Sequence, residues 1–234
     1  MILCLETATS LCSVALCNSR GVISLKENNE GKSHASMLTL YIEEVLKEAG
    51  IKAADLEAIA VSKGPGSYTG LRIGVSTAKG IAYAASVPLI AVETTLSMFH
   101  GFYNLAKEKY GATAGDFFCP MLDARRMEVY YSVFDSEGRT IKPIRAEVIE
   151  RKSFNDIPGS ARIFFFGNGA LKCKEVIIRK NIFFADDFKI SAVYIYKPAY
   201  DALREHRFED VAYFEPFYLK DFITSKPVKN ILMK

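Results

Sequence analysis

Apolar positions follow two different periods along the first half of the chain, and they predict three strands followed by alternating helices and strands. Short apolar or alternating runs predict strands over residues 2–7, 13–17, 22–26, 58–62 and 89–92. Apolar residues spaced by three or four positions predict helices over residues 36–49, 71–85 and 95–110. The predicted order of this half is therefore β-β-β-α-β-α-β-α.

The second half repeats this order more loosely. It predicts strands over residues 117–122, 128–134, 140–149, 162–166 and 182–185, and helices over residues 169–179 and 191–206. Two consecutive β-β-β-α-β-α-β units imply an α/β fold with mixed sheets, which is the duplicated actin-like (ribonuclease H-like) architecture. We divide the chain into an N-terminal subdomain, residues 1–112, and a C-terminal subdomain, residues 113–234, that ends in a basic tail.

Composition narrows the class of protein. Half of the 234 residues are hydrophobic (50%), so the chain can bury a sizeable core. No apolar stretch approaches the roughly 20 residues that span a bilayer, and the first residues lack the basic region of a signal peptide, so we expect a cytoplasmic protein without a membrane partner. The net charge of +3 does not by itself favour nucleic-acid binding. Five cysteines without a CxxC pair predict buried, reduced thiols.

A glycine-rich run, KGPGSYTGLRIG at residues 63–74, joins a predicted strand to a predicted helix. Such turns hold phosphates because free N–H groups and the helix dipole point into them. The spacing matches neither the GxxxxGK[ST] loop nor the GxGxxG turn of nucleotide-binding proteins. The alternative is a structural turn with a capped helix, formed by Gly64, Pro65, Gly66, Ser67, Thr69 and Gly70.

The helix after this turn carries a ridge of small residues. Gly70, Gly74, Ala78 and Ala82 are spaced by four and so lie on one helix face. A glycine inside a helix costs about 0.5–1 kcal/mol relative to alanine, and close approach of another backbone would offset this cost. That backbone is either the protein's own sheet or a helix of a second subunit, and the ridge fits both.

Candidate acid–base and metal chemistry is sparse in the sequence. The residue four positions after His34 is Leu38, so the HxxxH pair that a helix can offer to a metal is absent. Glu6 ends the first strand, where it could hold a metal or phosphate or only anchor the turn. The anchoring role is favoured. Asp123 occupies the corresponding place in the second half, and Arg125 and Arg126 after it could meet a carboxylate or phosphate or lie in solvent.

Five motifs together resemble the TsaB family, and they span nearly the whole chain in the family's order. They are residues 2–9 (ILCLETAT), 34–36 (HAS), 63–74 (KGPGSYTGLRIG), 166–170 (FGNGA) and 215–219 (EPFYL). The sequence departs from the family at Glu6, where the family commonly has aspartate. This departure weakens the case for a metal or nucleotide at that position.

The resemblance implies a non-catalytic subunit, an inactive paralogue and scaffold of the threonylcarbamoyltransferase TsaD. By this resemblance, the subunit and TsaD belong to one complex, which modifies the adenosine beside the anticodon of tRNAs that read codons starting with A. The implied partners are a TsaD-like catalytic subunit, a TsaE-like ATPase, a second copy of the chain and, through the complex, tRNA. No metal and no cofactor are expected, although a nucleotide shared at the partner interface stays open. The implied interface residues are His34, Met37, Leu38, Tyr41, Leu71, Gly74, Val75, Ala78 and Ala82.

Two alternative functions belong to a different class. The chain could be a stand-alone actin-like ATPase, or an enzyme resembling the M22 metallopeptidases. The small number of histidines, three in the whole chain, disfavours the peptidase. The basic tail could add an RNA contact, but a solvated terminus is the better interpretation.

Overall fold

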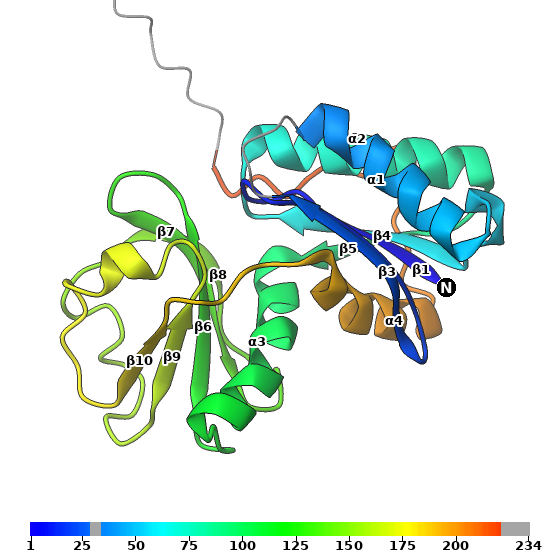
Figure 1. Cartoon of the computed structure of the whole chain (residues 1–234). Helices are drawn as coiled ribbons and strands as arrows, with labels where there is room; N and C mark the ends of the chain where they lie inside the picture. Colours follow the sequence, from blue (N-terminus) through cyan, green and yellow to red (C-terminus); the bar gives the residue numbers. More distant parts are fainter. Residues whose placement is uncertain (29–33, 221–234) are drawn as a thin grey trace, which may run out of the picture.

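The computed structural model describes residues 1–28 and 34–220 and contains two five-stranded sheets (Figure 1). The strands of the first sheet lie in the order β3-β2-β1-β4-β5. Their bounds are Ile2–Glu6 (β1), Cys12–Asn18 (β2), Gly21–Asn28 (β3), Ala58–Gly64 (β4) and Leu89–Glu93 (β5). The first three strands pair antiparallel, and β4 and β5 extend the sheet in parallel beside β1.

The second sheet has the same topology, with its strands in the order β10-β9-β6-β7-β8. Strands β6 to β8 form an antiparallel meander, and β9 and β10 run parallel to β6. Their bounds are Phe117–Asp123 (β6), Glu128–Asp135 (β7), Thr140–Val148 (β8), Ile163–Phe166 (β9) and Ile182–Ala185 (β10). The duplicated, actin-like α/β fold predicted from the order of elements is confirmed.

Three helices of the first half position the sheets. Helices α1 (His34–Ala49) and α2 (Tyr68–Ala85) cover one face of the first sheet, where their apolar side chains form a core with Leu3 and Leu5. Helix α3 (Thr94–Tyr110) contacts β4 and β5 of the first sheet and β6 and β7 of the second, and it lies between the two sheets in Figure 1. The relative position of the sheets therefore depends on α3.

The helix predicted over residues 169–179 is wrong, because only Leu171–Cys173 forms a short 3-10 helix there. Cys173 and Ile177 are buried in the core of the second sheet, and their spacing by four produced the helical pattern. The Arg179 guanidinium donates to the carbonyl oxygens of Phe154 (2.6 Å) and Ile157 (2.8 Å). These contacts with a distant loop hold the segment as a turn, so the tertiary structure overrides the local periodicity.

The last part of the chain returns to the first sheet. The helix predicted over residues 191–206 is shorter than expected: a 3-10 helix, Ala192–Ile195, leads into α4 (Tyr196–Arg204). Buried residues of this segment pack on the face of the sheet opposite α1 and α2, against Ile2, Cys4, Ala60 and Ile90. The division into residues 1–112 and 113–234 stays a prediction, and the tail after Lys220 lies outside the described residues.

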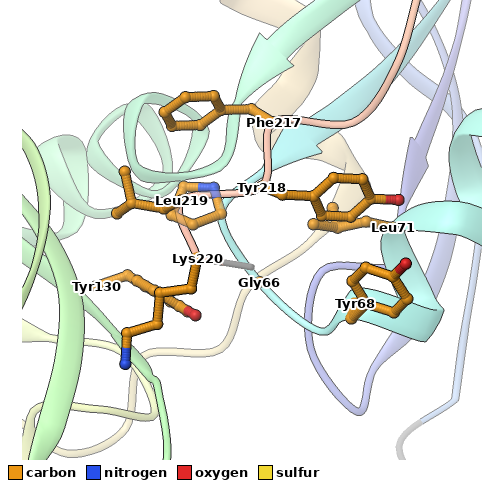
Figure 2. A pocket seen from close by; sticks show the side chains of 9 residues that line it. Gly66, Tyr68, Leu71, Tyr130, Phe217, Tyr218, Leu219 and Lys220 are labelled. Carbon is orange, nitrogen blue, oxygen red and sulfur yellow. The ribbon is translucent and has the colours of Figure 1, made fainter. Parts of the chain in front are cut away.

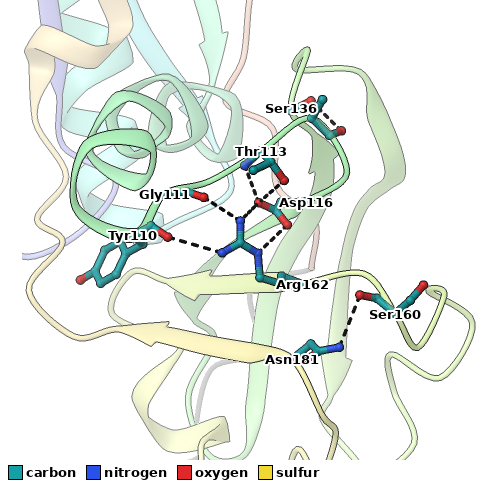
Figure 3. Close-up of polar contacts among 9 residues, drawn as sticks. Tyr110, Gly111, Thr113, Asp116, Ser136, Ser160, Arg162 and Asn181 are labelled. Atoms are coloured by element: carbon teal, nitrogen blue, oxygen red, sulfur yellow. Dashed lines mark hydrogen bonds and ion pairs between the residues drawn. The ribbon is translucent and has the colours of Figure 1, made fainter.

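An ion pair ties the end of α3 to the second sheet. Arg162 donates from Nε to Oδ1 of Asp116 at 2.8 Å, and its other amino groups reach the carbonyl oxygens of Tyr110 and Gly111 (Figure 3). Burial would raise the pKa of Asp116, but the hydrogen bonds from Arg162 and Thr113 outweigh burial and hold it below its ordinary value. The charged form is therefore the one that the fold stabilises.

All five cysteines are buried and unpaired, which confirms the prediction of buried thiols. No helix within residues 1–28 and 34–220 is both long enough and apolar enough to cross a membrane.

Candidate functional site

The glycine-rich turn between β4 and α2 is filled by the turn between β1 and β2. The Ser67 N–H donates to the Ala8 carbonyl oxygen at 2.7 Å, and the Thr7 hydroxyl donates to the Gly70 carbonyl oxygen at 2.8 Å. A Cβ added at Gly66 or Gly70 would lie under 3.0 Å from backbone atoms of Ala8 or Thr7. The absent side chains of these glycines thus make room for the chain's own backbone.

Two of the N–H groups that could have held a phosphate at this turn already have partners. The Ser67 N–H is bonded to Ala8, and the Gly70 N–H donates to the Ser67 side chain, which caps α2. An anion at this helix N-terminus would have to displace the turn between β1 and β2.

A segment that we call the C-terminal strap, residues 207–220, crosses α2 and the glycine-rich turn. The Phe217 N–H donates to the Lys63 carbonyl oxygen at 2.7 Å, and the Tyr218 ring lies 4.7 Å from the Tyr68 ring. The Lys79 ammonium donates to the Phe214 carbonyl oxygen at 2.8 Å. At its end the strap reaches the second sheet, where Lys220 forms an ion pair with Glu128.

The space between the strap, the glycine-rich turn and β7 is small (Figure 2). A cavity of about 40 Å³ is lined by Pro65, Gly66, Tyr68, Leu71, Tyr130 and the strap residues Phe217, Tyr218, Leu219 and Lys220. This volume has room for a few water molecules but not for a nucleotide.

Glu6 is fully buried at the end of β1. Its Oε1 accepts a hydrogen bond from the Ala8 N–H at 2.7 Å, and its Oε2 has no partner. The hydroxyl groups of Ser62, within the neighbouring strand β4, and of Thr94, directly after β5, are also buried without a partner. Burial raises the pKa of Glu6 to about 7, although the hydrogen bond from Ala8 favours the ionised form. Within the described residues, no three side chains of His, Cys, Asp or Glu are grouped as metal ligands.

The structure separates the nine predicted interface residues into two groups. His34 and Met37 are half-buried on α1, and His34 Nε2 lies 3.1 Å from the Leu11 carbonyl oxygen. The others, Leu38, Tyr41, Leu71, Gly74, Val75, Ala78 and Ala82, are buried. All of these except Leu71 and Gly74 belong to the core formed with the first sheet. In the single chain the ridge of small residues packs on the protein's own sheet, and the assignment of these seven residues to a partner surface stays a prediction.

The solvent side of the same two helices carries features that the sequence analysis did not single out. Leu40 on α1 is 44% exposed and Tyr83 on α2 is 80% exposed. Beside Tyr83 lies an open, shallow hollow lined by Lys52, Ala53, Ala54, Gly80, Ile81, Ala84 and Ala85. The signal available in the sequence was an aromatic residue that falls outside the apolar face of an otherwise small-residue helix.

The chain is similar to proteins of one tRNA-modification pathway. Residues 28–223 match the family described as TsaD, tRNA N6-adenosine threonylcarbamoyltransferase. The chain is 35% identical over 140 residues to the tRNA threonylcarbamoyladenosine biosynthesis protein TsaB of Escherichia coli, covering 60% of this chain and 57% of that protein. The TsaB of Bacillus subtilis is 30% identical over 146 residues, covering 61% of this chain and 58% of that protein.

Solved structures match over a longer part of the chain. A Pseudomonas aeruginosa protein described as similar to peptidase YeaZ has a TM-score of 0.81 at 25% identity, covering 94% of this chain and 99% of that one. A second structure, YeaZ from the same species, has a TM-score of 0.79 at 24% identity, covering 93% and 99%, and supports the fold. By sequence, the chain spans less than two thirds of the curated relatives it matches.

Proposed function

Because this chain belongs to the TsaD family, and its curated relatives are TsaB proteins, we propose that it is a non-catalytic partner subunit in the biosynthesis of tRNA threonylcarbamoyladenosine. In this role it binds a TsaD-like catalytic subunit in the cytoplasm and supports threonylcarbamoyl transfer to the adenosine next to the anticodon. It also pairs with a second copy of itself in isolation and works beside a TsaE-like ATPase.

The observation that carries this proposal is the filling of the glycine-rich turn. The β1–β2 turn packs into the glycine-rich turn, and the strap leaves only a small cavity beside it, so a nucleotide has little room at this helix N-terminus. This arrangement supports a structural role, and it weighs against the stand-alone ATPase. Calorimetric titration of the full chain with Mg-ATP tests the alternative, because micromolar binding with turnover would contradict the proposal.

We place the partner surface on the solvent side of α1 and α2. Leu40, Tyr83 and the hollow beside Gly80 offer exposed apolar area on these helices. Exposed aromatic and apolar residues around a shallow hollow are typical of protein–protein interfaces. The buried ridge on the other side of α2 then serves to hold this surface against the sheet.

Replacing Gly80 with arginine should weaken partner binding and leave the fold intact. Nothing lies within 4 Å of a Cβ built at Gly80, so the substitution causes no clash and removes a helix glycine. A charged side chain in the apolar hollow should weaken both self-association and binding of the catalytic subunit by at least about tenfold, which is about 1.4 kcal/mol. Light scattering after size-exclusion chromatography and a pull-down with the TsaD-like subunit of the same organism measure the two effects.

Gly159→Arg is the matched control, because a Cβ at Gly159 also meets nothing within 4 Å and the residue lies in an exposed loop of the second half. This variant should bind as the unchanged chain does. A folded Gly80→Arg protein with unchanged binding to both partners would place the interface elsewhere.

A further inference from the structure

The turn between β6 and β7, residues 124–127, carries two arginines whose backbone conformation is unusual. Arg125 has a φ of 69° and Arg126 a φ of 50°, so two consecutive non-glycine residues adopt the left-handed conformation. This conformation costs roughly 1–2 kcal/mol per residue, and such strain is typical of functional sites. Both side chains are exposed.

Hydrogen bonds hold the turn in this shape. The Arg125 N–H donates to Asp123 Oδ1 at 2.9 Å, the Glu128 N–H donates to the Arg125 carbonyl oxygen at 3.2 Å, and the Ala124 N–H donates to the Glu128 carbonyl oxygen at 3.1 Å. The Lys172 ammonium donates to the Arg126 carbonyl oxygen at 2.9 Å. The two guanidinium groups are therefore carried by a backbone that is fixed from several sides.

The acidic residues that flank the turn are neutralised by lysines. Asp123 forms an ion pair with Lys172, and Glu128 forms one with Lys220 of the C-terminal strap. Across the described part of the chain, neither Arg125 nor Arg126 lies within ion-pair distance of an acidic side chain. Four cations thus surround two carboxylates, and the two arginines supply the uncompensated charge.

We propose that Arg125 and Arg126 contact the phosphate backbone of an RNA, and because the inference rests on the proposed function, the RNA is the tRNA substrate. A guanidinium group donates paired hydrogen bonds to phosphate oxygens and keeps its charge at every working pH. Such contacts orient the nucleic acid without reading its sequence. Exposed positive charge without a compensating acid suits a nucleic-acid interface, which carries much more positive charge than a protein–protein interface.

The test measures binding of an unmodified tRNA transcript that reads a codon starting with A to the full chain, by fluorescence anisotropy across a range of salt concentrations. The variant is Arg125→Asn with Arg126→Asn, because asparagine tolerates the left-handed backbone. The slope of log K against log salt is negative, and loss of two phosphate contacts should reduce its magnitude by about 2. Binding should weaken by about tenfold near 0.1 M salt. The Arg125→Lys, Arg126→Lys variant should retain most of the affinity.

Lys107→Asn with Lys180→Asn is the control, since it removes the same charge at exposed positions. Lys107 lies in the last turn of α3 and Lys180 lies just before β10, at the opposite end of the parallel strands of the second sheet. It should leave the salt slope unchanged. Circular dichroism of each variant checks that the fold is retained.

Three results would overturn the inference. The first is that the unchanged chain does not bind the transcript at 50 mM salt. The second is that the Arg125→Asn, Arg126→Asn variant and the Lys107→Asn, Lys180→Asn control lose equal affinity. The third is that the Arg125→Asn, Arg126→Asn variant loses binding to the catalytic subunit in the absence of RNA. The last result would assign the arginines to an acidic protein surface. Arginine-dependent tRNA binding by a chain that binds no catalytic subunit would refute the proposed function and leave this inference in place.

Discussion

Replacing Gly70 with alanine should destabilise the protein by about 3 kcal/mol. The new Cβ would lie well inside contact distance of the Thr7 carbonyl oxygen, and backbone atoms cannot move aside as the end of a flexible side chain can. Overpacking at a rigid site costs about 1–3 kcal/mol or more, which exceeds the gain of up to about 1 kcal/mol from replacing a helix glycine. Urea unfolding followed by circular dichroism measures the loss.

Gly80→Ala provides the comparison on the same helix. Nothing lies within 4 Å of its new Cβ, so this change should stabilise the protein by about 0.5–1 kcal/mol. Opposite signs at the two glycines would show that one face of α2 needs glycine for packing and the other does not. Equal effects at both sites would contradict the close packing of the β1–β2 turn on α2. By the same reasoning Gly74→Leu should unfold the protein, since Gly74 faces the Thr7 hydroxyl.

The second large effect concerns the pH dependence of stability, which Glu6 should dominate between pH 4.5 and 7. Its pKa is raised from an ordinary value of 4.5 to about 7, so in this range the folded protein binds a proton that the unfolded chain has lost. The stability contributed by protonated Glu6 is complete below pH 4.5 and is lost as the pH rises through 7. The difference of about 2.5 pKa units corresponds to about 3 kcal/mol.

Glu6→Gln measures this contribution, because glutamine resembles the neutral carboxyl group and keeps an oxygen for the Ala8 N–H. The variant should match the unchanged protein near pH 5 and be more stable by up to about 3 kcal/mol at pH 8. Urea unfolding at pH 5, 6, 7 and 8 gives the difference. Burial lowers the pKa of His100, which acts in the opposite direction in a similar pH range, but this effect is the same in both proteins and cancels. A difference that does not vary with pH would contradict the assignment to Glu6.

Local periodicity was enough to predict the sheets. The apolar runs at residues 2–7 and 117–122 become β1 and β6, the central strands of two sheets with identical topology. The helix prediction for residues 169–179 was wrong for a physical reason. Cys173 and Ile177 face a core, although the chain between them is not an α-helix. Burial at a spacing of four is common to a helix and to a turn fixed by distant contacts.

The candidate site was less accessible to prediction because its decisive contacts join distant residues. The Tyr68 and Tyr218 rings are in contact because the strap crosses α2, and no local pattern in the sequence predicts that contact. The ridge of small residues on α2 allowed two interpretations, since a glycine face accommodates any close backbone, and only the position of Thr7 decides between them. The motif at residues 215–219 marked the strap as important without indicating what it covers.

The return of the chain to the first sheet has a consequence for how the protein is made. The face of that sheet formed by Ile2, Cys4 and Ile90 is covered by residues 192–203, which leave the ribosome late. N-terminal units of many proteins fold during synthesis, but here the first unit keeps an apolar face open until the second sheet and α4 have emerged. The two halves should then complete folding together, because the first sheet is covered on this face only after α4 has been synthesised.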